Sequence, residues 1–502
     1  MSEHAGSTPV DPFARCRARL ETLIGFLDGA QAAVMAHGEL EQRVGLDGRE
    51  VLRLALQGHL DRRAEREERC DDVCDAQGVP RRSVEAGHER MLATVFGDVI
   101  VTRLAYRHRG RANLHPADRA LNLPVERHSH GLRELAGIEA ARGSFDGAVE
   151  AIGRGTGQAV AKRQVEELAT RAAVDFEAFY ATLPRSETVV GDVVVVSADG
   201  KGIVMRPDGL RPATADAAAK ATTKLDRRLS KGEKRNRKRL AEVGAVYELT
   251  PVARTAADIF ATSTSPAAPT PAAPAKNKWL TASIVDDAAT VIAQIFDEAE
   301  RRDPDHQRTW VALVDGNNHQ IRRLTTEATT RKVTVTIIVD LIHVLEYLWK
   351  AAWCFYDEGD TAAETWVHTK ALAVLNGHAS TVAASIRRKA TCLRLGPYKR
   401  VNADTCADYL LRKRRYLDYP TALAKGWPIA TGVIEGACRH LVKDRMDITG
   451  ARWGLEGAEA ILKLRALRAN HDFPAYWQYH LTQEQQRVHD TRYLNSALPR
   501  AA

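Results

Sequence analysis

Three aspartates stand at the ends of apolar, β-branched runs: Asp199, Asp315 and Asp340. A continuous apolar run of this length predicts a strand buried on both faces, and α/β folds place their chemistry at strand ends. Asp199 and Asp315 are each followed by Gly, and Asp-Gly is also a common turn dipeptide. One such aspartate alone would indicate only a turn, whereas the recurrence of the pattern favours a shared acidic site.

A fourth acid, Glu435, lies in the first turn of an expected helix. Carboxylates are ionised at neutral pH without any tuning of their pKa, and Mg²⁺ prefers oxygen ligands, so such a group of acids can bind divalent metal. Glu435 and Arg439 are four residues apart, and an ion pair on the helix surface is the alternative. Asp340, His343 and Glu346 also share one face of an expected helix.

The elements around these acids alternate in a defined order. Three strands are followed by a helix, a strand, a helix and a last strand. The expected strands cover 193–200, 244–250, 279–285, 309–314 and 333–339, and the first helix covers about 288–301. Residues 201–205 continue the first strand or form its hairpin partner. Three antiparallel strands joined to two crossover strands predict a mixed sheet covered by helices, which is the ribonuclease-H-like architecture within a multi-domain α+β chain.

Length and charge bound the class of protein. The chain has 502 residues, a net charge of +8 and a pI of about 9.1, so several domains and a polyanionic partner are expected. Its seven cysteines are odd in number and scattered, which argues against a disulfide framework and for a reducing compartment. With no leader peptide and no membrane-length apolar run, we expect a cytoplasmic protein.

The N-terminal third predicts three regions. Residues 1–90 form a helical region, and 91–142 a small β and loop unit whose strands turn at Gly97-Asp98. Residues 143–185 predict a helix-turn-helix, because a glycine-rich break separates two short helices and basic residues lead the second. A plain helical hairpin is the alternative. The side chains expected to face DNA are those of Lys162, Arg163, Gln164 and Arg171.

The remaining segments differ in composition. Within the expected core, 190–344, a basic insertion covers 212–240 and an Ala- and Pro-rich linker covers 262–276. The insertion contributes further expected DNA contacts, namely Arg235, Arg237, Lys238 and Arg239. An aromatic-rich helical insertion domain follows at 345–430. Residues 431–470 carry the last acid, and the place of the tail, 471–502, is not predicted.

The motifs together resemble a known family. Asp199-Gly200, Val314-Asp315-Gly316, Val339-Asp340-Leu-Ile-His343 and Gly432-Val-Ile-Glu435, followed by Gly450-Ala-Arg-Trp453, resemble those of bacterial insertion-sequence transposases. The resemblance is to the Asp-Asp-Glu class, close to the ISKra-type group, and covers roughly residues 90–490. It implies a ribonuclease-H-like catalytic domain, an upstream DNA-binding region, a helical insertion before the last acid, and Mg²⁺-dependent cutting and joining of DNA.

The resemblance implies a role for each acid. Two divalent ions, Mg²⁺ or Mn²⁺, would be held by Asp199 as bridging ligand, by Asp315 at one ion and by Glu435 at the other. Asp340 competes with Asp315 for the second position. If Asp315 takes it, Asp340 and His343 support the site or contact a flipped base or a phosphate. Lys443 and Arg452 either grip target phosphate or are simply solvated.

The expected function is therefore that of a DNA transposase. Its partners would be double-stranded DNA, as terminal inverted repeats and as target, and a second copy of the chain when assembled on DNA. Two alternatives stay open. One is a catalytically inactive DNA-binding repressor or remnant, and the other is a structure-selective nuclease on the same fold. A repressor or remnant would not cleave repeat-bearing DNA, whereas a transposase would. A structure-selective nuclease would release free ends without joining them.

Overall fold

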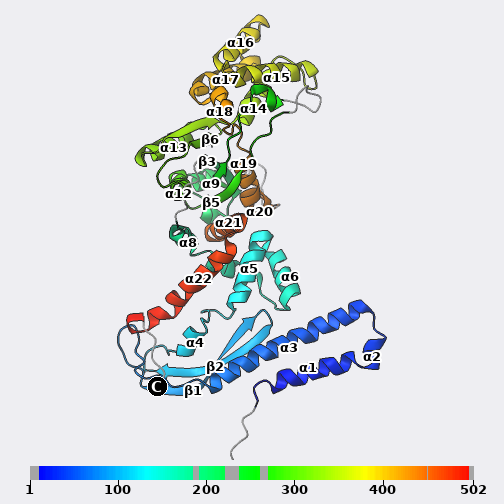
Figure 1. Cartoon of the computed structure of the whole chain (residues 1–502), viewed down its shortest axis with the longest axis vertical. Helices are drawn as coiled ribbons and strands as arrows, with labels where there is room; N and C mark the ends of the chain where they lie inside the picture. Colours follow the sequence, from blue (N-terminus) through cyan, green and yellow to red (C-terminus); the bar gives the residue numbers. More distant parts are fainter. Residues whose placement is uncertain (1–10, 185–190, 221–236, 261–268, 449, 497–502) are drawn as a thin grey trace, which may run out of the picture. The chain divides into compact units, whose positions relative to one another are not determined.

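The computed structural model describes residues 11–184, 191–220, 237–260, 269–448 and 450–496. The chain forms two compact units, each taken by itself below (Figure 1). One comprises Met1–Ala181 with Asp472–Ala502, and the other comprises Thr182–His471. No helix in the described ranges combines the length and the apolar character needed to cross a membrane.

The first unit is mostly helical. Its elements are α1 (Ala14–Leu27), α2 (Ala30–Ala33), α3 (His37–Glu65), β1 (Ser83–Thr94), β2 (Gly97–Arg107), α4 (Pro116–Ala120), α5 (His130–Arg142), α6 (Phe145–Thr156), α7 (Lys162–Arg171), α8 (Phe176–Thr182) and α22 (Phe473–Val488). The tail, residues 471–502, whose place the sequence did not predict, therefore contributes the helix α22 to this unit. Its buried Tyr476 and Trp477 supply apolar surface that the preceding segments need for a core.

The expected β-unit is an antiparallel hairpin, β1 with β2, but its turn differs from the prediction. Thr94 pairs with Gly97, so the two turn residues are Val95 and Phe96, and the predicted Gly-Asp turn at Gly97 was wrong. The hydroxyl of Thr94 explains the shift, because it donates to the Gly97 carbonyl at 2.7 Å and accepts from the Phe96 amide at 3.2 Å. These bonds close the turn two residues earlier.

Buried charges tie α22 into the first unit. The side chain of Arg133, on α5, is only 1% exposed. It pairs with Glu126, and it also pairs with Glu484 of α22 at 2.6 Å. His480 of α22 bonds to Asp175 at 2.7 Å. Because a buried charge without its partner is costly, these pairs make α22 an integral part of the unit.

The second unit is α+β and contains a mixed five-stranded sheet in the order β5-β4-β3-β6-β7. The strands are β3 (Val193–Val204), β4 (Lys238–Leu249), β5 (Lys276–Ser283), β6 (Trp310–Val314) and β7 (Val335–Val339). β4 is antiparallel to β3 and β5, whereas β6 is parallel to β3 and β7. The mixed sheet, with three antiparallel strands and two further parallel strands, agrees with the sequence-based prediction.

Strand lengths depart from the prediction on the β3–β4 side. Residues 201–204 continue β3, and β4 begins at Lys238 instead of Gly244, with Val204 paired to Lys238. The charged residues at the start of β4 gave no strand pattern, so this part of the strand was not predicted. It forms because pairing along the whole of β3 satisfies the hydrogen bonds of its backbone amides and carbonyls. Of the basic insertion, α9 (Pro212–Lys220) is helical and residues 221–236 lie outside the described part of the chain.

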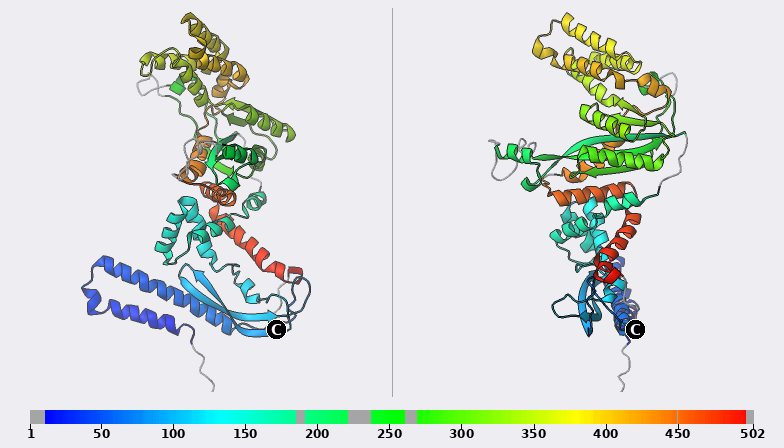
Figure 2. Two further views of the ribbon diagram at one scale, coloured as in Figure 1. Left: turned by 180° about the vertical axis from the view of Figure 1, so that it is seen from behind. Right: turned by 90° about the vertical axis from the view of Figure 1, so that its left-hand side faces the viewer.

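Helices cover the sheet and extend from it (Figure 2). α12 (Ala288–Arg302) packs on β3 and β4, α13 (Asn318–Thr330) on β6 and β7, and α21 (Leu455–Ala469) on β5. The aromatic-rich segment forms α14 (Leu341–Ala352), α15 (Thr361–Leu375), α16 (Ala379–Cys392), α17 (Pro397–Lys413) and α18 (Tyr419–Ala424). α14 leaves the sheet directly after β7, and α17 packs along it on the return path.

Candidate active site

The strand register brings three aspartates to one edge of the sheet. Ser197 of β3 pairs with Leu313 of β6, so Asp199 and Asp315 follow two residues later on adjacent parallel strands. Val314 pairs with Val339 of β7, which places Asp340 beside Asp315. Because neighbouring strands are about 4.8 Å apart, Asp199 and Asp315, which are separated by 116 positions in sequence, become close neighbours.

Asp199 lies within β3 and is half-buried. One carboxylate oxygen accepts from the Gly200 amide at 2.7 Å, and the other accepts from the Cys438 thiol at 3.3 Å. Cys438 follows Glu435 by three residues, at the end of α19 (Gly432–Ala437). The helix that carries the fourth acid therefore contacts the first acid directly.

Glu435 lies near two other expected site residues. Within the described ranges, ligand atoms of Asp340, His343 and Glu435 lie within 4.8 Å of one another and meet the spacing of a metal site. Thr431 joins this group, because its hydroxyl is 2.6 Å from Asp340 and 3.4 Å from Glu435. Glu435 is exposed, and the alternative ion pair with Arg439 is not formed, since Arg439 approaches Asp444 at 3.8 Å.

Asp340 and Asp315 differ in how much of each carboxylate is free. Asp340 is 0% exposed, and its oxygens accept from the amides of Ile342 and Thr431, the Thr431 hydroxyl and His343 Nδ1. Asp315 is only half-buried, and one of its oxygens accepts from the Asn317 amide at 2.7 Å. Asp315 therefore has more carboxylate oxygen free for a metal, whereas each oxygen of Asp340 already accepts two hydrogen bonds.

His343 is oriented by Asp340. Its Nδ1 lies 3.0 Å from the carboxylate, which raises the pKa of the imidazole above its usual value despite partial burial. The ring is partly exposed and its Nε2 is directed elsewhere. A carboxylate behind a histidine is the arrangement that fixes the ring of a metal ligand or of a proton carrier.

Asp315 and His343 both line a cleft of about 480 Å³. The cleft is basic as well as acidic, because Arg412 and Lys413 line it too. Burial lowers the pKa of Lys413, and its ammonium group donates to Asn318. Tyr409 donates to the backbone carbonyl of Asp315 at 3.0 Å. Acids beside fixed cations suit a phosphate group bound through metal.

The helix after Glu435 is irregular. α19 passes into π-helical turns over Cys438–Lys443, where the wider backbone is typical of functional sites. Lys443 in these turns is exposed, and so is Arg452 further along. Both keep the solvent access that a contact to target DNA requires.

Several residues at this edge were not expected from the sequence. Cys438, Thr431 and Tyr409 contact Asp199, Asp340 and Asp315, respectively, from segments distant in sequence, and no local pattern marks them. Lys413 lines the same cleft through its bond to Asn318. Glu242, on β4 opposite Gly200, is a further carboxylate close to Asp199. Burial and the nearby charge of Asp199 raise its pKa.

Two short helices occupy the region of the predicted helix-turn-helix, but Gly153 and Gly155 of the expected break lie within α6. α6 ends at Gly157, which has a φ of +73°, and α7 begins at Lys162. Lys162, Arg163 and Arg171 are exposed and pair with Asp146, Glu167 and Glu126, respectively. Gln164 accepts from the Ala161 amide at 3.2 Å. The pairs of Lys162 and Arg163 are exposed and weak enough to exchange for phosphate, whereas the partner of Arg171, Glu126, is largely buried.

The basic insertion is only partly described. Arg235 lies outside the described residues, and Lys238 is exposed at the start of β4. Arg239 donates to the carbonyls of Ile284 and Gly209, and burial lowers its pKa. Arg237 precedes β4 and its carbonyl accepts from Met205. Lys238 is thus the member of this group most available to DNA.

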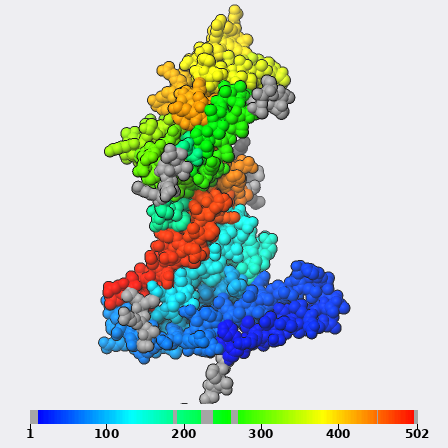
Figure 3. All heavy atoms as spheres, in the orientation of Figure 1, coloured from blue at the N-terminus to red at the C-terminus, as the bar shows by residue number. Residues whose placement is uncertain are grey.

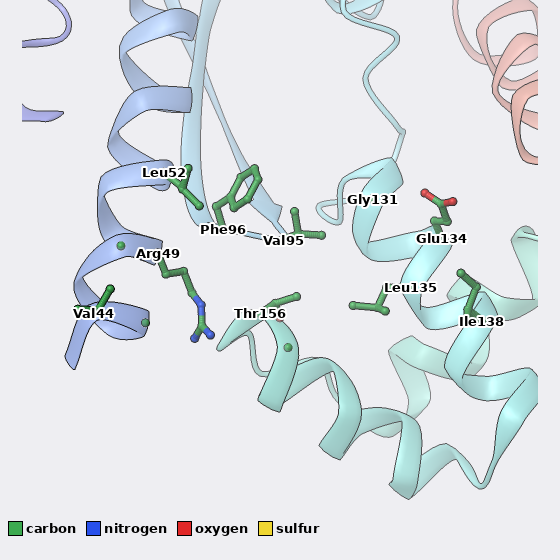
Figure 4. A pocket seen from close by; sticks show the side chains of 13 residues that line it. Val44, Arg49, Leu52, Val95, Phe96, Gly131, Glu134, Leu135, Ile138 and Thr156 are labelled. Atoms are coloured by element: carbon green, nitrogen blue, oxygen red, sulfur yellow. The ribbon is translucent and has the colours of Figure 1, made fainter. Parts of the chain in front are cut away.

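A second cavity, in the first unit, lacks comparable chemistry. It measures about 740 Å³ and is lined mainly by apolar side chains of α3, the β1–β2 turn, α5 and the end of α6 (Figure 4). Glu134 and Arg49 are its charged members, and burial raises the pKa of Glu134. The acids, imidazole and cations needed for phosphoryl chemistry meet instead at the sheet edge of the second unit.

No protein-family model matches this chain, and no curated protein is significantly similar to it in sequence. The site geometry is therefore the basis for any functional conclusion.

Proposed function

We propose that this protein is a DNA transposase of the Asp-Asp-Glu class, of the ISKra type, with a ribonuclease-H-like catalytic unit. It binds the terminal inverted repeats of its insertion sequence, and it cuts and joins DNA. The observation that carries the proposal is the register that aligns Asp199 with Asp315, together with the contact of Cys438, on the helix of Glu435, with Asp199.

In this proposal Asp199, Asp315 and Glu435 hold two divalent ions, Mg²⁺ or Mn²⁺. Carboxylate oxygens are the ligands that these ions prefer, and Glu435 already belongs to a group with the spacing of a metal site, although its partners there are Asp340 and His343. When bound, such a metal pair stabilises the attacking and leaving oxygens of phosphodiester transfer.

The chain's own residues then have distinct tasks. Asp340 orients His343, and His343 Nε2 is placed to hold or move a proton in the cleft. Arg412 and Lys413 draw the phosphate toward Asp315. In the first unit, Lys162, Arg163, Gln164 and Arg171 contact double-stranded DNA through α7 as a helix-turn-helix.

Cleavage of a defined DNA end tests the proposal. The full chain is incubated with Mg²⁺ and a duplex carrying the inverted repeats that flank its gene, and nicks and joined products are separated on denaturing gels. We expect Asp199→Asn, Asp315→Asn and Glu435→Gln to abolish both products. Asp305→Asn is the matched control, because Asp305 is exposed in the loop before β6, at the opposite edge of the sheet.

Each alternative has its own signature in the same assay. Binding to the repeats without cleavage under Mg²⁺ or Mn²⁺ would identify a repressor or remnant. Cleavage of branched DNA that lacks repeats, without joining, would identify a structure-selective nuclease. Full activity of Asp199→Asn would refute the assignment of the site.

A further inference from the structure

The turn between α16 and α17 carries an unusual concentration of positive charge. Between residues 387 and 403 the chain has six lysines and arginines and no acidic residue. Three of the cations are engaged: Arg387 pairs with Asp408, Arg400 pairs with Asp404, and Lys389 lies over the Tyr356 ring at 4.0 Å. Arg388, Arg394 and Lys399 are the remaining three.

These three cations are exposed and make no ion pair within the described residues. Unlike the engaged cations, they do nothing for the packing of the helical array. Like charges in a short segment repel one another, so their accumulation costs stability unless a polyanion is bound.

The same turn exposes apolar side chains. Tyr398 is 96% exposed, and Leu393 and Val401 are each about half exposed. A fully exposed tyrosine contributes nothing to a core, whereas its ring can pack on a sugar or a base edge while its hydroxyl stays hydrated. Exposed apolar groups bordered by cations are typical of contacts in a DNA groove.

Helical geometry connects this turn to the candidate active site. Tyr398, Thr405, Tyr409 and Arg412 are spaced by seven, four and three residues, so they follow one face of α17. The last three line the cleft that contains Asp315. Fourteen residues of helix separate Tyr398 from Arg412, which corresponds to about 21 Å or about six base pairs of B-DNA.

We propose that the α16–α17 turn, residues 393–399, is a binding surface for duplex DNA that runs along this face of α17 into the cleft. Arg394 and Lys399 bind phosphates, and Tyr398 packs in a groove about six base pairs from the phosphate held at Asp315. The inference rests on the proposed function, because DNA must occupy the cleft. The turn belongs to the yellow residues of the helical array in Figure 3.

Charge along the path supports a duplex. Two acids, Asp315 and Asp408, line the cleft. Asp408 lies on α17, and its charge is neutralised by its ion pair with Arg387. An acidic protein could pair with the cations, but it would give no reason for exposed cations and an exposed aromatic ring to lie at the start of the helix whose other end lines the cleft of Asp315.

Salt-dependent DNA binding tests the surface. The full chain in EDTA is titrated onto a fluorescein-labelled 40-base-pair duplex of arbitrary sequence at several salt concentrations. Each lost phosphate contact reduces the slope of log K against log salt by about 0.9, so Arg394→Ala/Lys399→Ala should reduce it by about 1.8. Lys278→Ala/Lys332→Ala is the matched control, because both lysines are exposed at the opposite edge of the sheet.

Tyr398→Ala should lower the affinity at least about five-fold without changing the slope, because the ring carries no charge. A photoreactive benzophenone side chain at position 398 should cross-link about six base pairs from the mapped cleavage position. Circular dichroism of each variant confirms folding, which is expected because the side chains are exposed.

The outcomes separate this inference from the proposed function. If the parent chain binds the duplex and both sets of variants bind with unchanged affinity and slope, the inference is overturned and an acidic protein becomes the expected occupant of the turn. If the parent does not bind DNA at all, the inference and the proposed function both fail.

Discussion

Replacement of Asp340 by alanine should destabilise the second unit. The carboxylate caps α14 by accepting from the Ile342 amide at 3.0 Å, and loss of such a cap costs about 1 kcal/mol. The Thr431 amide and His343 would also be left without their acceptor inside the protein, at about 1–3 kcal/mol each. The Thr431 hydroxyl can turn to Glu435 and adds little. Water can reach the partly exposed His343, so its loss lies at the lower end of its range and the expected total is about 3–5 kcal/mol.

Scanning calorimetry in EDTA measures this loss without any contribution from metal. For a unit of this size, each kcal/mol lowers Tm by about 2–3 °C, so Asp340→Ala should lower it by about 6–15 °C. Asp315→Asn is the comparison, because an amide oxygen can still accept from the Asn317 amide, and its Tm should change by less than about 2 °C. The reverse ranking of the two Tm values would refute the division of roles between Asp315 and Asp340.

Three further predictions concern the same edge of the sheet. At about pH 8, a disulfide reagent should modify exposed Cys392 and leave Cys438 unmodified in the folded chain, because burial raises the pKa of the Cys438 thiol. His343→Gln should cost more stability at about pH 5.5 than at about pH 9. The neighbouring carboxylate raises the pKa of His343, so its stabilisation is full below about 6.5 and is lost as pH rises through the raised value. Gly316→Ala should cost about 1 kcal/mol more than Gly359→Ala, because both glycines have a φ near +90° but only the first would place a methyl group 2.7 Å from a tyrosine hydroxyl.

Three measurements check these predictions. Mass spectrometry of the modified chain identifies the reactive thiols, and early modification of Cys438 would contradict its burial. Urea unfolding of His343→Gln and the parent at both pH values gives the pH dependence, and an equal loss at each would exclude a charged pair. Urea unfolding of the two glycine variants gives their difference, and equal costs would mean that Tyr409 moves freely.

Local patterns predicted the strands that carry the acids. Apolar β-branched runs ending in aspartate at Asp199, Asp315 and Asp340 are strong signals, because a strand buried on both faces tolerates few polar residues. The start of β4 was missed, since Lys238 and its charged neighbours have little strand propensity of their own. Pairing with β3 supplies the stabilisation that their sequence does not indicate.

Contacts between distant segments were beyond sequence reasoning. The bond from Cys438 to Asp199 spans 239 positions, and that from Lys413 to Asn318 spans 95. Nothing in either local sequence specifies its partner, because the packing of whole elements decides such contacts. The choice between Asp315 and Asp340 likewise needed the burial and hydrogen bonds of each carboxylate.

The place of α22 has a consequence for biosynthesis. Because α22 supplies Glu484 and His480 to a unit that otherwise ends at Ala181, the first unit cannot complete its buried ion pairs while the ribosome is still translating the second unit. A chain released before α22 is made would carry Arg133 without one of its two carboxylates. The synthesis of α22 thus governs when the first unit matures, and products truncated before it should be cleared by proteolysis before they can compete with the intact protein.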